Sequence, residues 1–461
     1  MAAVLLAAVG CTSTKTEKQT SANPFFEEKY GTPHEIPPFE VFTIDNYREA
    51  ILKGVEEENE EIKAIIANTE APTFENTIQA MDETGKLLSK ARSVFSSLTS
   101  SNSDEEKRAL QKEISPILTA HSDDINLNQD LFARVKTVYE NMEQLGLNKE
   151  QKSLTKKVYD RFVKSGANLS EEDKAKLREL NSKLSAVQLQ FSQNLLHETN
   201  NTYVTVDSRD ELPGLPEANI QQAAELAKSI GQEGKFTFNM QRPSCNPVLQ
   251  YCSNRELRKK IYDAYNNRGN QDNEYNNKAL CAQIVDLRIQ KAKLMGYEDY
   301  ASMALEDRMA KNSKNVYDLL DQVWAPAVKA AQAEIADIKV EMEKDGVSGE
   351  PERWDYWYYL DKAKAAKFNV DEAKISEYLE INNVQQGIFY VAGKLYGLKF
   401  VERTNEYPVY EPTAKSWDVM DKDGKQIAIF YSDFFPREGK GAGAWCGGFR
   451  STHYENGERV L

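Results

Sequence analysis

The sequence predicts a mainly α-helical protein with a small β-sheet near its C-terminus. Two observations support this fold class. Most of the 461 residues belong to stretches in which apolar side chains recur at intervals of three and four, the spacing of an amphipathic helix. Alternating apolar and polar residues, the spacing of a strand, occur in only a few short stretches, and the clearest of these lies after residue 407.

The first residues resemble a secretion signal. MAAVLLAAVGC at 1–11 is an apolar run that ends in small residues and a cysteine. At about ten residues it is too short to span a bilayer, but it fits the apolar core of a signal peptide. Gly10-Cys11 at its end resembles the lipobox of bacterial lipoproteins. We therefore expect a lipid on Cys11 and a location at the bacterial cell envelope, lipid-anchored or periplasmic; the cytoplasm is the alternative if the N-terminus is not a signal.

Residues 12–245 are predicted to form a tether followed by a first helical region. The segment 12–40 begins with Ser, Thr and Lys residues, and we expect a tether that continues into an extended entry segment. The N-terminal helical region is then expected over 41–245. Its predicted helices cover 44–67, 74–99, 104–145, 149–165 and a long stretch that begins after Ser170.

The helix after Ser170 has the clearest local signals. Ser170 provides an N-cap hydroxyl and acidic residues follow it in the first turn, where they favour the free amides. An apolar stripe then recurs at intervals of three and four and predicts one face packed on a core. Its residues are Leu177, Leu180, Leu184, Val187, Phe191 and Leu195.

A second helical region is expected over 246–405, followed by a β-region over 406–461. The predicted helices of the second region cover 254–266, 276–295, 315–344 and 383–396. Short strand signals precede them at Tyr203–Val206 and Phe236–Met240. In the last region an Asp-Lys-Asp-Gly turn at 421–424 separates two runs of β-branched and aromatic residues, which predicts a hairpin.

The glycine-rich segment GKGAGAWCGGFRS at 439–451 is predicted to add an extended strand to this hairpin. Glycine is used where φ is positive or where another backbone comes close. The sequence leaves both explanations open. It does not fit a phosphate-binding loop, because GxxxxGK[ST] is not met and no strand leads into a helix here.

Composition and motifs exclude several function classes. A net charge of −14 makes nucleic acid an unfavourable partner. HETNN at 197–201 begins like the zinc-protease pattern HExxH, but position 201 is Asn, so the second histidine ligand is missing. The helical phase predicts an exposed His197 and an inward-facing Glu198. Of the cysteines that follow Cys11, the spacing predicts buried free thiols, with a bridge between Cys245 and Cys252 as the alternative.

Several segments, in order along the chain, resemble the thimet oligopeptidase and peptidyl-dipeptidase Dcp family of zinc metallopeptidases. They include PTFENTIQAMDETGKLL at 72–88, FSQNLLHETNNTYVTVDSRDELPGLPE at 191–217, NRELRKKIYDAYNNRGN at 254–270 and WDYWYY at 354–359. The last is DFFPREGKGAGAW at 433–445, which is similar to the family's Asp-x-x-x-Arg-x-Gly-Lys-x-x-Gly-Ala segment. The resemblance implies a neurolysin-like fold of two helical lobes, truncated here, and hydrolysis of short peptides with zinc as cofactor.

The family's HExxH helix and its third zinc ligand follow the glycine-rich segment, and no residue of this chain matches them. We therefore expect no catalytic residue, no metal ligand and no hydrolysis from this chain alone. The segment itself corresponds to a family strand that pairs with an extended substrate, so Gly443, Ala444 and Trp445 are the predicted substrate-binding residues. Trp445 favours the Dcp branch, which releases C-terminal dipeptides.

Two alternatives from other function classes stay open at this point. One is a lipid-anchored, non-catalytic protein that binds peptides, and the other is a helical scaffold without a ligand. In each case we expect a monomer whose only membrane contact is through Cys11. Short peptides are the expected partners of the peptidase and of the peptide-binding protein, but not of the scaffold. A helical lobe without a partner lobe is also expected to expose more apolar surface than a monomer usually does.

Overall fold

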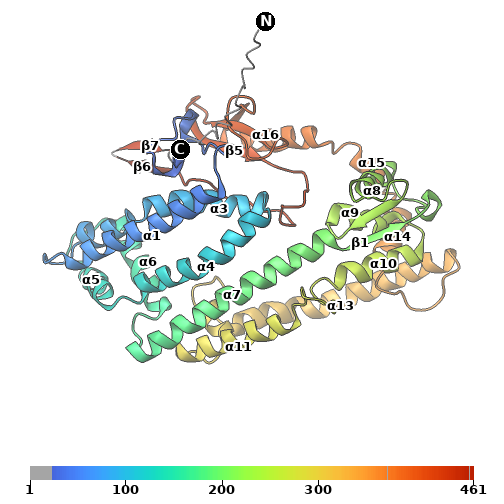
Figure 1. The fold of residues 1–461 in the computed structure, drawn as a ribbon. Helices are drawn as coiled ribbons and strands as arrows, with labels where there is room; N and C mark the ends of the chain where they lie inside the picture. Colours follow the sequence, from blue (N-terminus) through green and yellow to red (C-terminus); the bar gives the residue numbers. More distant parts are fainter. Residues whose placement is uncertain (1–22, 371, 456, 461) are drawn as a thin grey trace, which may run out of the picture.

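The computed structural model describes residues 23–370, 372–455 and 457–460. The predicted signal segment and Cys11 lie outside the described residues. The described part of the chain is mainly helical with small antiparallel sheets, which confirms the predicted fold class (Figure 1). None of its helices is both long enough and apolar enough to cross a membrane.

The N-terminal helices follow one another through short turns. They are α1 (Ile44–Ala67), α2 (Ala80–Asp82), α3 (Lys86–Ser101), α4 (Glu105–Asn126), α5 (Gln129–Glu140) and α6 (Lys149–Ser165), with the 3-10 helices η1 (Pro24–Phe26) and η2 (Pro33–Glu35) and the π-helix η3 (Phe74–Gln79). Their apolar faces form two cores, one between α1, α3 and α4 and one between η3, α5 and α6. The bounds predicted for α1 and α6 are confirmed.

Two of the predicted helices are divided in the structure. The stretch 74–99 breaks at Gly85, which has a φ of +67° and precedes α3. The positive φ favours glycine, and a Cβ at this position, 2.5 Å from the Glu58 carboxylate carbon, would also displace the Glu58 side chain. The stretch 104–145 divides after Asn126, because Asn128 starts a new helix by accepting a 2.9 Å hydrogen bond from the backbone N–H of Leu131.

The long helix α7 (Glu171–Asn201) connects the two halves of the molecule (Figure 1). Ser170 caps it as predicted, accepting a 3.2 Å hydrogen bond from the backbone N–H of Asp173. The helix packs on α4 with one side and on α11 (Lys278–Leu294) with another. Leu177 is fully buried, but Leu180 and Val187 are only half-buried. Helix α7 therefore contacts two neighbouring helices, and apart from Leu177 the residues of the predicted stripe are only half-buried.

The second half contains further helices and a two-stranded sheet. The elements are η4 (Arg209–Glu211), α8 (Glu217–Ser229), α9 (Arg242–Tyr251), α10 (Arg255–Asn266), α12 (Tyr300–Leu305), α13 (Ser313–Lys344), α14 (Tyr356–Phe368), α15 (Glu372–Ser376), α16 (Ile381–Tyr396), β1 (Tyr203–Val206) and β2 (Phe236–Asn239). The two predicted short strands pair antiparallel, with Tyr203 opposite Asn239. One core runs from Val206 to Ile261. It crosses the predicted boundary between residues 245 and 246, which lies inside α9, so packing does not divide the chain there.

The C-terminal sheet has the strand order β3-β4-β5. Its strands are β3 (Lys399–Glu402), β4 (Lys415–Met420) and β5 (Gln426–Ser432), and β6 (His453–Glu455) pairs with β7 (Glu458–Val460) in a separate hairpin. The predicted turn joins β4 to β5 and ends with Gly424 at a φ of +79°. The third strand of this sheet is β3 and not the glycine-rich segment, and β3 lies before residue 406, where the β-region was predicted to begin. Helix α16 packs on this sheet through Phe389, whose ring stacks 4.1 Å from that of Phe400.

Candidate functional site

The predicted substrate-binding residues lie in an irregular, exposed segment. Residues 433–452 are all described and contain neither helix nor strand, so the predicted glycine-rich strand is not formed. Gly443, Ala444 and Trp445 are exposed, and Trp445 retains 46% of its accessible surface. The reason lies in the hydrogen bonds of the segment, because its backbone pairs with a helix–helix turn instead of with the edge of the β3-β4-β5 sheet.

The backbone that approaches the glycine-rich segment belongs to the turn between α3 and α4. The N–H of Ser103 donates to the Gly439 carbonyl at 2.8 Å, and the N–H of Gly441 donates to the Ser100 carbonyl at 2.9 Å. A Cβ on Gly439 would lie 2.1 Å from the Ser103 oxygen, which no side chain tolerates. Close approach of another backbone therefore explains the glycine at position 439.

A different requirement applies at Gly443. Its φ is +96°, a conformation that favours glycine, while an added Cβ would meet nothing within 4 Å. Gly447 has an equally open surrounding without the positive φ. Conformation and not contact therefore explains the glycine at 443, and space for a ligand backbone remains beside both residues.

Three residues of the family-like motif form an ion network just before the glycines. The Asp433 carboxylate accepts hydrogen bonds from Arg437 at 2.7 and 2.9 Å, from Lys440 at 2.8 Å and from the Tyr410 hydroxyl at 3.0 Å. Burial alone would raise the pKa of Asp433, but the hydrogen bonds from Arg437 and Lys440 outweigh it and lower the pKa. Asp433 is therefore held as a carboxylate with its partners in place.

The same motif also contacts the end of α7 and the start of α9. The Asn200 amide donates to the Glu438 carbonyl at 2.7 Å. The Gln241 amide donates to the Arg437 carbonyl at 3.2 Å and to the Asn200 side-chain oxygen at 2.8 Å. The motif thus joins the C-terminal segment to the second half of the molecule as well as to α3.

The far end of the segment is anchored by an aromatic cluster. The Phe449 ring lies 4.9 Å from Phe39, 5.8 Å from Tyr410 and 5.9 Å from Tyr431, measured between ring centroids. Arg450 adds a 2.8 Å hydrogen bond to the His34 carbonyl. Residues 442–448 are therefore an exposed arch between two fixed ends.

The histidines do not converge on a metal site. His34, His121, His197 and His453 belong to η2, α4, α7 and β6. Within the described ranges no group of three or more His, Cys, Asp or Glu side chains could hold a metal ion. The residues present here therefore do not fit a zinc ion, and no chemical step through zinc is assigned to them.

His197 differs from its prediction, whereas Glu198 agrees with it. The His197 ring is half-buried and stacks on Tyr275, with 3.7 Å between ring centroids, because the loop after α10 folds back over α7. Glu198 is buried and accepts 2.6 Å hydrogen bonds from the backbone N–H of Gly269 and from the Asn273 amide. Both side chains therefore hold this loop in place.

The cysteine thiols divide into two pairs by burial. Cys245 and Cys252 are buried free thiols, and burial raises the pKa of Cys245 to about 11. The prediction of free thiols is confirmed for these two, without the alternative bridge. Cys281 and Cys446 are also free but exposed, so the prediction of burial is wrong for them.

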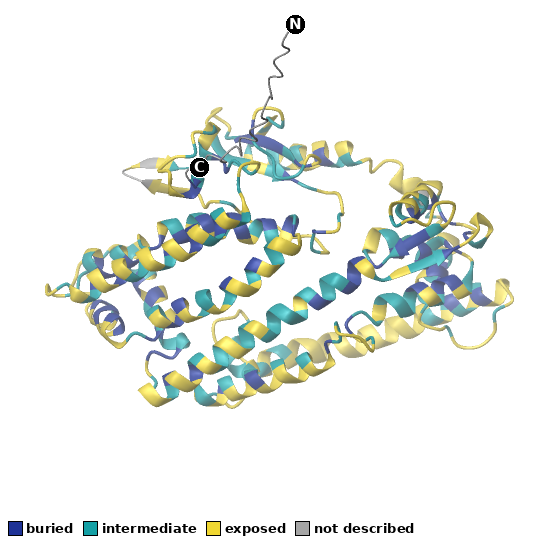
Figure 2. Ribbon diagram, viewed as in Figure 1, coloured by how far each residue is buried: buried dark blue, intermediate teal, exposed yellow. Residues whose placement is uncertain are grey.

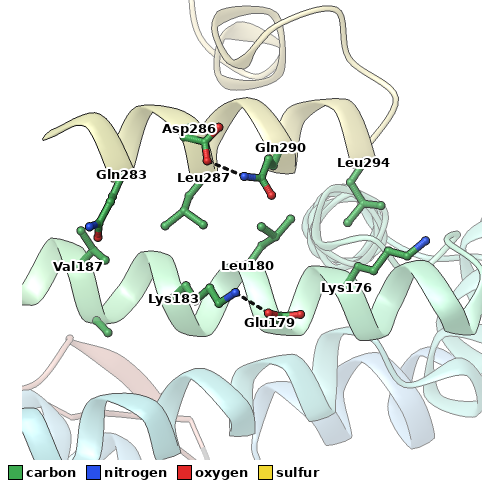
Figure 3. A pocket seen from close by; sticks show the side chains of 11 residues that line it. Lys176, Glu179, Leu180, Lys183, Val187, Gln283, Asp286, Leu287, Gln290 and Leu294 are labelled. Atoms are coloured by element: carbon green, nitrogen blue, oxygen red, sulfur yellow. Dashed lines mark hydrogen bonds and ion pairs between the residues drawn. The ribbon is translucent and has the colours of Figure 1, made fainter. Parts of the chain in front are cut away.

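A groove of about 630 Å³ lies between α7 and α11, far along the chain from the glycine-rich segment (Figure 3). Leu180, Val187, Leu287 and Leu294 form its apolar floor. The charged and polar side chains of the rim pair with one another, Lys183 with Glu179 and Gln290 with Asp286. This groove carries no nucleophile or acid–base pair and is an imperfectly filled helix contact.

Sequence reasoning found the glycine-rich segment but missed the network that holds it. Asp433, Arg437 and Lys440 belong to the family-like segment at 433–445. The local signal for their pairing is one acidic and two basic side chains within a short stretch, because the helical i, i+4 rule does not apply to a segment without a helix. Their partners in the α3–α4 turn and at the end of α7 carry no comparable local signal.

Comparison with known proteins gives one family. Residues 248–460 match Peptidase family M3. Over 433 residues the chain is 34% identical to proteins named Dipeptidyl carboxypeptidase from Escherichia coli (strain K12) and from Salmonella typhimurium, covering 93% of this chain and 63% of each relative. It is 28% identical over 418 residues to Oligopeptidase A from Escherichia coli (strain K12), covering 90% of this chain and 61% of that protein.

The chain thus spans about three-fifths of the length of the curated relatives that it matches. The matches extend across both helical halves and the C-terminal sheet. They confirm the resemblance predicted from the sequence: this chain is related, over nine-tenths of its length, to the thimet oligopeptidase and peptidyl-dipeptidase Dcp family of metallopeptidases.

Proposed function

We propose that this chain is part of a zinc metallopeptidase that hydrolyses short peptides and releases dipeptides from their C-termini. The observation that carries the proposal is the 34% identity to two proteins named Dipeptidyl carboxypeptidase. Identity to the proteins named Oligopeptidase A is lower, at 27 to 28%. This difference supports removal of dipeptides over cleavage within a longer peptide.

Within such an enzyme, the exposed arch at 442–448 contacts the main chain of the substrate. Its small side chains let a second backbone come close, and Trp445 offers a large apolar face beside them. The open space around Gly443 and Gly447 supports this role. The described residues are thereby assigned peptide binding, and the 461-residue chain alone is proposed not to hydrolyse peptides.

A binding assay and a turnover assay on the purified chain test this proposal together. We expect saturable binding of a fluorescently labelled short peptide, without cleavage and without stoichiometric zinc. Trp445→Ala is expected to weaken binding about tenfold, because an aromatic contact of this size contributes one to two kcal/mol at a binding site. Phe435→Ala is the matched control, since Phe435 is a similarly exposed aromatic, at 49%, outside the arch.

The outcomes separate the possible functions. Tight zinc with turnover would overturn the proposed inactivity of the chain. Saturable binding that is insensitive to Trp445→Ala would overturn the role of the arch. Absence of peptide binding would favour a helical scaffold, and peptide binding in a full-length protein that still lacks turnover would favour a non-catalytic peptide-binding protein.

We further propose that a lipid on Cys11 holds a monomeric protein at the bacterial cell envelope. The short apolar run before Cys11 supports this. Expression with radiolabelled palmitate tests it: the wild type should carry label and sediment with membranes, whereas Cys11→Ser should do neither. Light scattering of the soluble variant measures its oligomeric state.

A further inference from the structure

A continuous chain of contacts connects the α3–α4 turn to the exposed arch. The Arg437 guanidinium donates to the Ser101 carbonyl at the end of α3 and to Asp433. Asp433 in turn accepts from Lys440 at 2.8 Å, and the Lys440 ammonium lies 5.9 Å above the ring of Trp445. Each link is charge-assisted or a cation–π contact, the stronger kinds of polar interaction in proteins.

The charged side chains in this chain of contacts pair with one another and are largely buried. Only 8% of the Asp433 side chain, 11% of Lys440 and 17% of Arg437 are accessible. The Lys440 ammonium also donates to the Asp433 and Phe435 carbonyls, at 2.8 and 3.0 Å. The Lys440 ammonium and both terminal nitrogens of Arg437 thus donate within the protein, and Arg437 Nε is buried 3.7 Å from the Glu411 carboxylate, so these groups are poorly placed to hold a substrate directly. What they determine is the position of Trp445 and its neighbours.

The backbone contact at Gly439 fixes the same segment independently. The Gly439 carbonyl accepts from the Ser103 N–H, and a Cβ on Gly439 would lie 2.1 Å from the Ser103 carbonyl oxygen. Two residues further on, the N–H of Gly441 donates to the Ser100 carbonyl. The arch therefore leaves the helical body at one defined point, three residues before Ala442. A binding segment without regular secondary structure needs such a support, because loosely held contacts lose affinity and precision.

We propose that Asp433, Arg437 and Lys440, together with the glycine at 439, are positioning residues for peptide binding. They hold the arch on the α3–α4 turn and orient Trp445, and they do not touch the peptide. This inference rests on the proposed function, since it assumes that the arch binds the substrate main chain. It assigns the specificity of the site partly to residues of the N-terminal helices.

Gly439→Ala and Gly387→Ala form a matched pair that tests the inference. The first places a Cβ against the Ser103 carbonyl oxygen, whereas the second, on α16 and outside the arch, meets open space without a positive φ. Hydrogen exchange measured on peptides covering 439–448 reports the order of the arch, and titration with the labelled short peptide reports the dissociation constant. For Gly439→Ala we expect faster exchange and a dissociation constant raised about tenfold, as a small misplacement of a binding group produces. For Gly387→Ala we expect both to match the wild type.

Lys440→Met provides a second test if Gly439→Ala does not fold. It keeps the length of the side chain and the Asp433–Arg437 pair but removes the charge that faces Trp445. We expect a lower melting temperature, because the buried Asp433 loses one of its cations, and a weaker peptide complex at a temperature where the variant is folded. An arch that exchanges faster in either variant while the dissociation constant stays at the wild-type value would overturn the inference alone. Absence of peptide binding by the wild type would overturn the proposed function, and the inference with it.

Discussion

The N-terminal core around α5 and α6 and the long helix α13 are both built from apolar helix faces, but only the first buries them. Phe162 on α6 and Leu131 on α5 are fully buried, and Phe132 retains 3% of its surface. On α13, Tyr317 is 64% exposed, Leu320 50% and Trp324 71%. Figure 2 shows most of this helix in the colour of exposed residues. These three α13 residues lie at helical spacing on one stripe, as the core residues of α6 do.

The difference shows that an apolar stripe does not by itself make a core. Helix α13 is held at its C-terminal end, where Ile338 and Met342 pack on Tyr358 and Tyr359 of α14. Before that end, residues 313–334 are almost all accessible, and the free energy of burying their apolar side chains is not gained within the described part of the chain. Helix α13 is therefore expected to be less stable against local opening than the N-terminal helices.

The largest effect in this comparison is expected from Phe162→Ala. Removing a fully buried phenylalanine leaves a cavity between α5 and α6 and should lower the free energy of unfolding by about 4 kcal/mol. Tyr317→Ala is the control on α13 and should change it by less than about 0.5 kcal/mol, because this side chain has little contact to lose. Urea unfolding followed by circular dichroism measures both. Equal effects would remove the distinction between the two regions.

The same contrast explains which elements could be predicted from the sequence. α1 and α6 have a cap at their first residue and an unbroken stripe, and their bounds were predicted correctly. The breaks at Gly85 and Asn128 were missed, because apolar spacing continues on both sides of each break. α9 and α14 were missed as well, since α9 contains two prolines and the apolar and charged residues of α14 do not separate onto two faces.

The candidate site was predicted to a similar extent. Glycine content located the segment at 439–448, and the close approach at Gly439 is one of the two explanations that the sequence allowed. The partner of that approach could not be predicted, since Ser100 and Ser103 lie more than three hundred residues away in the chain. A strand was expected because the segment follows a predicted hairpin and resembles a strand of the family, but tertiary contacts at both ends decided the conformation.

An acid-sensitive anchor holds the fixed end of the α13 region. Asp355, fully buried, pairs with Arg255 at 2.7 Å and Arg258 at 3.1 Å. Burial alone would raise the pKa of Asp355, but the hydrogen bonds from Arg255 and Arg258 outweigh it and lower the pKa. Its stabilising contribution is therefore present above the unfolded-state pKa of about 4 and is lost as the pH falls through the lower folded-state pKa.

Asp355→Asn should lower the free energy of unfolding at pH 7 by about 3 kcal/mol, because it leaves the buried Arg258 and the partly exposed Arg255 without their carboxylate. Asp337→Asn is the control, since Asp337 pairs with Lys367 at the surface and contributes less than about 1 kcal/mol. Urea unfolding between pH 7 and pH 3 compares them. The Asp355 variant should also lose part of the acid dependence of the wild type; a parallel pH dependence in both would contradict this assignment.

Hydrogen exchange sharpens the comparison without a substitution. Amides in residues 313–334 of α13 should exchange about a hundredfold faster than those of α3, whose Ala91 and Val94 are buried, because opening α13 exposes little additional surface. Mass spectrometry of peptides from the two helices measures the rates. Equal protection of the two helices would mean that α13 is covered by a contact other than those among the described residues.

The smallest effect on stability is expected from Trp324→Gln, together with a clear effect on solubility. Trp324 is 71% exposed on the α13 stripe, so its replacement should change the free energy of unfolding by less than about 0.5 kcal/mol. Exposed apolar stripes drive self-association, and the variant should therefore associate less at high protein concentration. Ala333→Gln adds the same polar group to an exposed position of the same helix and controls for it. Equal association of all three proteins in light scattering would show that the α13 stripe does not drive self-association. Self-association would then be assigned to α16, where Ile388, Val391 and Leu395 also lie exposed at helical spacing.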